Sequence, residues 1–194
     1  MGIITRDSLW TLETYSKNRP TFRSQVIEHK RTRTVHIGDH VTLLFEDEMT
    51  IRYQIQEMLR IEKIFDEEGI QHELDSYLPL LPEGRNFKAT MLIEYTDADE
   101  RAIALTQLKG IERKVFIQVE GAAKVYAIAD EDLERENEVK TSAVHFLRFD
   151  LNKDMAEALK YGVALHMGVD LPAYTVAATS VNPETRTALV KDLA

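Results

Sequence analysis

Residues 34–45 read TVHIGDHVTLLF, two short runs of strand-forming residues separated by the turn-forming pair Gly38-Asp39. In the second run, the apolar residues Val41, Leu43 and Phe45 alternate with other residues. Alternation with a period of two places these side chains on one face of a strand. The stretch therefore predicts a β-hairpin and the first pair of strands in a sheet.

The rest of the chain continues this mixture of short strands and helices. Strands are predicted at 87–95, 115–120, 123–129 and 139–151, an extended stretch at 163–179, and an acidic helix or loop at 130–138. Helices are predicted at 5–30, 47–67, 97–108 and 152–159, and from Asn182-Pro183 onward. Within the first range, Pro20 is expected to start a helix. After the second range, Gly69 is expected to break the helix, and a short helix through Leu74 follows. Because there is no regular strand–helix–strand alternation, we predict the α+β class, with a mostly antiparallel sheet packed by several helices.

The length and composition are those of one globular domain. The chain has 194 residues, of which 44% are hydrophobic and 29% charged, and no linker rich in Pro, Gly or Ser divides it. This composition is too apolar for a disordered chain. We therefore expect a single domain spanning residues 1–194.

Charge and cysteine content exclude several classes of function. The formal net charge of -9 disfavours nucleic acid and anionic lipid, because the long-range field of the protein repels phosphate. The absence of cysteine excludes disulfides, thiolate–zinc sites and cysteine nucleophiles. The sequence shows no signal peptide and no membrane-spanning run, so we expect a cytoplasmic protein. It also lacks phosphate-binding glycine loops and a GxSxG elbow, which disfavours nucleotide-dependent and serine-hydrolase mechanisms.

The helix predicted at 50–65 carries the first candidate site residue, Glu62. Successive residues of a helix are about 100° apart, which gives this segment an apolar face formed by Ile51, Ile55, Met58, Leu59, Ile61 and Phe65. Glu62 projects into the middle of this face. Gln54 also lies on the face, and Glu57 lies at its edge. A buried carboxylate needs a partner. Glu62 is therefore expected to form a structural ion pair, to bind a metal or to act as an acid or base.

His145 is the second candidate. It shares a strand face with Ala143, Leu147 and Phe149, so its ring is expected to point inward. Such a histidine is either a hydrogen-bonded core residue or a metal ligand. With Glu62, Glu57 and Glu94 it would form a carboxylate-rich site suited to iron, manganese or zinc, although no HExxH or paired ExxH motif is present.

One basic segment stands out in this acidic chain. Its members, which have only Glu28 as an acidic neighbour, are Arg19, Arg23, Lys30, Arg31 and Arg33. The segment is expected either to bind an anion or an acidic partner, or to be a solvated surface that pairs with the acids of the chain itself. Aromatic residues for stacking bases are sparse, which disfavours specific nucleic-acid binding.

Several motifs together resemble a bacterial family catalogued as domain of unknown function 3501. They are Val26-Ile-Glu-His-Lys-Arg, Leu44-Phe-Glu-Asp, Tyr53-Gln-Ile-Gln-Glu-Met-Leu-Arg-Ile-Glu, Met91-Leu-Ile-Glu and Ala143-Val-His-Phe. The resemblance implies no assigned activity, but genes of this family lie near those of rubrerythrin-like and iron–sulfur oxidoreductase-like proteins, which implies a peroxide or redox setting. It also implies histidine in place of Leu171 in many relatives, which makes that position a poor candidate for an essential ligand.

Three functional hypotheses follow. The first is a metal-binding accessory protein of a redox system. The second is a non-catalytic interaction module that docks a partner oxidoreductase through residues 19–33. The third is an enzyme with Glu62 as general acid or base. A homo-oligomer is compatible with all three.

Overall fold

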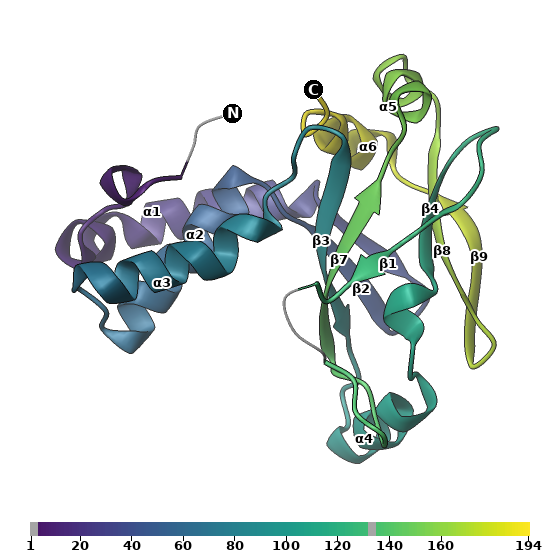
Figure 1. Ribbon diagram of the computed structural model, residues 1–194, viewed down its shortest axis with the longest axis horizontal. Coiled ribbons are helices and arrows are strands. Elements are labelled where there is room, and N and C mark those ends of the chain that lie inside the picture. Colours follow the sequence, from purple (N-terminus) through teal and green to yellow (C-terminus); the bar gives the residue numbers. More distant parts are fainter. Residues whose placement is uncertain (1–3, 132–134) are drawn as a thin grey trace. The chain divides into compact units, whose positions relative to one another are not determined.

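The computed structural model describes residues 4–131 and 135–194, which pack into two compact units (Figure 1). The helical unit comprises the described residues before Arg33 together with Glu46–Leu81, and the sheet unit comprises Arg33–Phe45 and Pro82–Ala194. The prediction of a single domain stays a prediction. Residues 132–134 of the predicted acidic segment lie outside the described residues. None of the described helices combines the length and apolar character needed to cross a membrane.

The helical unit contains three helices whose starts are set by side-chain caps. They are α1 (Leu12–Arg31), α2 (Glu48–Glu62) and α3 (Glu67–Tyr77), with short 3₁₀ turns η1 (Arg6–Ser8) and η2 (Leu78–Leu80). The side chains of Thr11, Asp47 and Asp66 each accept a hydrogen bond from an amide in the first turn that follows. Each bond satisfies an amide that has no partner within the helix.

The prediction that Pro20 starts a helix is wrong, because α1 runs through it. Proline removes the hydrogen bond to the carbonyl four residues earlier, here that of Ser16. Both residues are exposed, so water can reach this carbonyl. On the other side of α1, Tyr15, Phe22 and Val26 are buried, and their packing holds the helix together across the proline.

The predicted helix at 47–67 is also corrected. It ends at Glu62, where Lys63 adopts a left-handed conformation with φ 56°. Gly69 does not break a helix; it lies in the first turn of α3, where its amide donates to Asp66 at 2.8 Å. The break thus comes from the backbone at Lys63 rather than from the glycine.

Helix α2 packs on two sides at once. One side, Ile51, Ile55 and Leu59, contacts an apolar cluster that includes Ile70 and Leu74 of α3. Another side, with Met49 and Tyr53, packs against the cluster formed by Tyr15, Phe22 and Val26 of α1. Helix α2 is therefore the central helix of this unit, as Figure 1 shows.

The sheet unit confirms the α+β class. The first antiparallel sheet has the order β1 (Thr34–Ile37), β2 (Val41–Phe45), β3 (Asn86–Ile93), β7 (Val144–Asp150), β6 (Ile128–Ala129). The second has the order β5 (Val125–Tyr126), β4 (Val115–Val119), β8 (Leu165–Leu171), β9 (Tyr174–Ser180). The helical elements of this unit are α4 (Ala98–Gln107), η3 (Ile111–Arg113), α5 (Lys153–Lys160) and α6 (Pro183–Val190).

The predicted hairpin is confirmed, and the strand predicted at 123–129 is divided. Antiparallel pairing of β1 with β2 places Ile37 opposite Val41. Of the divided strand, β5 pairs with β4 and β6 pairs with β7, so its two halves belong to different sheets. Alternate residues of the central strands, among them Leu43, Met91 and Ile117, are fully buried in a core shared by both sheets.

A buried ion pair joins the two ends of the sheet unit. The Arg33 side chain, just before β1, is only 2% exposed and pairs with Asp192, which lies in the turn after α6. The Arg33 Nε also donates to the carbonyl oxygen of Phe45 at 2.9 Å. Breaking such a pair is costly because it leaves a charge inside the protein without its counter-charge.

Replacing Asp192 with asparagine is therefore expected to lower the free energy of unfolding by about 3 kcal/mol. Urea denaturation followed by circular dichroism measures this change. The matched control is Glu120→Gln, which removes an exposed carboxylate of the same unit and should change stability by less than about 0.5 kcal/mol. Equal stabilities for the two variants would show that the buried pair contributes nothing to the fold.

Candidate functional site

Glu57 of α2 lies at the centre of a polar cluster that we call the Glu57 cluster, formed by Tyr15, Arg19, Glu57 and Arg60. Arg19 donates to the two carboxylate oxygens at 2.7 and 2.8 Å. The hydroxyl of Tyr15 donates to Oε1 at 2.6 Å, and Arg60 donates to both oxygens at 3.3 and 3.2 Å. Both oxygens of this buried carboxylate are thus hydrogen-bonded within the helical unit.

These contacts determine the ionisation of the cluster. The hydrogen bonds from Arg19 lower the pKa of Glu57 to about 2, against the opposing effect of burial. Burial, followed by the neighbouring Glu57, raises the pKa of Tyr15. The chemistry is that of a fixed carboxylate between two guanidinium groups, which suits the attachment of α1 to α2 better than proton transfer.

Glu62 does not have the environment that the sequence predicted. It is exposed, as are Ile61 and Phe65 on the same predicted apolar face, which are 58% and 79% exposed. Glu62 is the last residue of α2, beyond the part of the helix that its neighbours cover. Its charge does act on Glu73, whose pKa is raised first by burial and then by repulsion from Glu62.

His145 is fully buried, as predicted, and both of its ring nitrogens are engaged. The distance from Nδ1 to Oδ2 of Asp130 is 2.6 Å, and Nε2 lies 2.9 Å from Oγ1 of Thr141 and 3.0 Å from the carbonyl oxygen of Ser142. Asp130 also accepts from the amide of Phe146 at 3.0 Å. This is the arrangement of a hydrogen-bonded core histidine that ties a loop to β7.

The predicted metal ligands occupy separate settings. Glu57 and Glu62 belong to the helical unit, whereas His145 and Glu94 belong to the sheet unit. Glu94 is exposed and accepts a hydrogen bond from Thr42 at 2.5 Å. Within residues 4–131 and 135–194, no group of three or more histidine, aspartate or glutamate side chains is arranged to hold a metal ion. Metal binding by these residues stays a prediction.

The basic segment is not one surface. Arg19 belongs to the Glu57 cluster and Arg33 is buried in its pair with Asp192, so these two residues pair with acids of the chain itself, which was one of the two alternatives. Arg31 is exposed and pairs with Glu28 at 2.8 Å, while Lys30 lies over the ring of Tyr53 at 5.7 Å. Arg23 is exposed on α1. A partner-binding role of Arg23, Lys30 and Arg31 stays a prediction.

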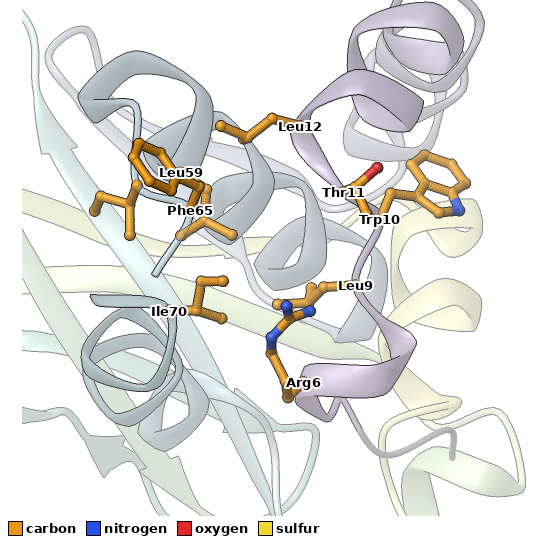
Figure 2. A pocket seen from close by; sticks show the side chains of 9 residues that line it. Arg6, Leu9, Trp10, Thr11, Leu12, Leu59, Phe65 and Ile70 are labelled. Carbon is orange, nitrogen blue, oxygen red and sulfur yellow. The ribbon is translucent and has the colours of Figure 1, made fainter. Parts of the chain in front are cut away.

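The helical unit also has an apolar pocket that sequence reasoning missed (Figure 2). Its volume is about 210 Å³. The pocket is lined by η1, by the segment that leads into α1 together with the first residue of that helix, by the end of α2 with the connection that follows, and by α3. The lining residues are Arg6, Leu9, Trp10, Thr11, Leu12, Leu59, Ile64, Phe65 and Ile70. In Figure 2 the guanidinium of Arg6 is directed toward Leu9. The signal that could have found the pocket is Phe65, an apolar aromatic residue just past the end of a helix.

Gln56 holds one wall of the pocket in place. This residue is buried, and its side-chain oxygen accepts from the Trp10 amide at 2.8 Å, while its side-chain nitrogen donates to the Trp10 carbonyl at 3.3 Å. The amide group thus binds both backbone groups of one residue, as a neighbouring strand would. Gln56 and Glu57, which are adjacent in the motif at residues 53–62, therefore attach the N-terminal part of the chain to α2. Gln56 binds Trp10, and Glu57 binds Arg19.

Comparisons with other proteins agree with this fold and assign no activity. The family model described as protein of unknown function (DUF3501) matches residues 3–193. A crystal structure described as a novel protein of unknown function from Burkholderia pseudomallei K96243 shares 56% sequence identity, covers 98% of this chain and 99% of its own, and superposes with a TM-score of 0.95. No curated protein matches the chain.

Replacing Glu57 with glutamine should lower the free energy of unfolding at pH 7 by about 3 kcal/mol, because the pKa of this carboxyl is lower in the folded state than in the unfolded chain. The stabilisation by the ionised form is complete above about pH 4.5 and is lost as the pH falls toward about 2. The stability difference between wild type and E57Q should therefore shrink across this interval, as measured by urea denaturation at a series of pH values. Glu28→Gln, which alters an exposed pair with Arg31, is the control and should show no such trend. A difference that is independent of pH would contradict the assignment.

Proposed function

The chain belongs to the family of proteins of unknown function DUF3501, so its function has to be inferred from the geometry of the structure. We propose that it is a non-catalytic binding module whose helical unit accepts one apolar side chain of a partner protein. The observation that carries this proposal is the apolar pocket beside the exposed ring of Phe65.

The size of the pocket favours a side chain over a whole small molecule. Sites for drug-sized ligands and cofactors usually occupy about 300–1,000 Å³. An apolar cavity of about 150 Å³ is enough to hold benzene. The pocket, at about 210 Å³, therefore fits one aromatic or branched aliphatic side chain.

The chemistry of the lining supports the same occupant. Most lining residues are apolar, among them Leu9, Leu59 and Ile70, which belong to a buried cluster and so keep a fixed shape. Phe65 is 79% exposed, which leaves its ring free to cover an inserted side chain. Burial of one aromatic or aliphatic anchor in a preformed pocket is the usual centre of a protein–protein interface.

The same observations favour binding over catalysis. The general acid or base proposed from the sequence, Glu62, is exposed and lacks the apolar surroundings that this role requires. The buried candidates Glu57 and His145 are hydrogen-bonded to their own units. We keep the redox or peroxide setting as part of the proposal, so oxidoreductases are the first partners to examine.

Display of random dodecapeptides against the whole chain tests the proposal. We expect the selected peptides to share one aromatic or branched aliphatic residue, and Phe65→Ala to weaken their binding at least about fivefold. Tyr161→Ala is the matched control, since it removes another highly exposed aromatic ring, in the sheet unit. Failure to select any peptide, or equal binding by wild type and F65A, would refute a docking role for the pocket.

A further inference from the structure

Among the described residues that line the pocket, Arg6 is the one with a charged side chain. Its side chain bonds Glu67 through Nε at 2.9 and 3.1 Å and through Nη2 at 2.7 Å. In the described residues no hydrogen bond from Nη1 is present. An apolar cavity thus has a guanidinium group on its wall, and this group already holds one carboxylate.

The ion pair between Arg6 and Glu67 is exposed to solvent. Glu67 is 74% exposed in its side chain and lies in the first turn of α3, whereas Arg6 is 37% exposed. Ion pairs between such exposed groups are weak, and salt screens them. Loss of this pair therefore leaves no buried charge behind, because both side chains stay in contact with water.

We infer that the pocket takes the C-terminal residue of a partner protein, with its apolar side chain in the cavity and its terminal carboxylate on Arg6 in place of Glu67. This inference rests on the proposed function and names the part of the partner that binds. In a C-terminal residue the carboxylate and the side chain are attached to the same Cα. One residue therefore delivers both groups to a cavity of about 210 Å³. The planar guanidinium is the group best matched to a carboxylate, because it donates two parallel hydrogen bonds.

Three peptides test the inference: GSGSGF with a free carboxylate, the same peptide with an amidated end, and amidated GSGSFE, whose only carboxylate is on the glutamate side chain. Trp10 is the only tryptophan of the chain and lines the pocket, so its fluorescence reports binding, with titration calorimetry as a second measurement. At low ionic strength the free-carboxylate peptide is expected to bind about fivefold more tightly than either amidated peptide.

Two variants separate Arg6 from general electrostatic effects. Arg6→Gln should remove the preference for the free carboxylate while leaving binding of the amidated GSGSGF unchanged. Glu67→Gln should strengthen binding of the free-carboxylate peptide alone, because it removes the competing carboxylate. Glu131→Gln is the control: Glu131 forms a similar double hydrogen bond with Arg148, but in the sheet unit, and its loss should change nothing.

The outcomes are distinguishable. Equal binding of the free and amidated GSGSGF peptides overturns the inference and leaves the side-chain pocket standing. Tighter binding of GSGSFE than of the free-carboxylate peptide also overturns it, since the acid is then read from a side chain. Absence of binding by all three peptides, together with failure of the display experiment, overturns the proposed function as well.

Discussion

The helical unit depends on one buried carboxylate. Glu57 is acceptable inside the protein because Arg19, Arg60 and Tyr15 all donate to it, and those donors come from both α1 and α2. An arrangement of the helices that separates Glu57 from these donors leaves a buried charge without a partner, which is strongly destabilising. The Glu57 cluster thus fixes how α1 lies on α2, and the pocket, which uses residues from both, depends on that arrangement.

Adjacent residues on a helix point in directions about 100° apart, and α2 uses this property at Gln56 and Glu57. Gln56 turns toward the segment before α1 and binds Trp10, whereas Glu57 turns toward α1 itself and binds Arg19. A single turn of helix therefore positions two successive parts of the N-terminal region. The motif Tyr53–Glu62 thus has a structural explanation, in which Gln56 holds the pocket wall in place although it is not one of the lining residues.

Local sequence patterns predicted which helices and strands form better than they predicted which other parts of the chain those elements contact. Alternation of residues identified the β1–β2 hairpin, the helix predicted at 152–159 corresponds to α5, and the face of β7 predicted that His145 points inward. Helical periodicity failed for Glu62, because a period shows which residues share a face but not how far along the helix that face is covered. Pro20 was read as a boundary because the packing of α1 around it is a property of distant residues. The pocket combines residues from 6 to 70, and no local pattern joins them.

Arg33 was misread for a related reason, and its location affects how the chain folds. Its partner, Asp192, is 159 residues away, near the end of the chain. The β1–β2 hairpin pairs residues that are close in the sequence, whereas the contact between Arg33 and Asp192 requires two segments 159 residues apart to meet. Contacts of such high sequence separation form late and slow the folding of a domain. The ion pair therefore closes the sheet unit over two segments far apart in the sequence, and we expect it to form after the β1–β2 hairpin, whose partners lie only a few residues apart.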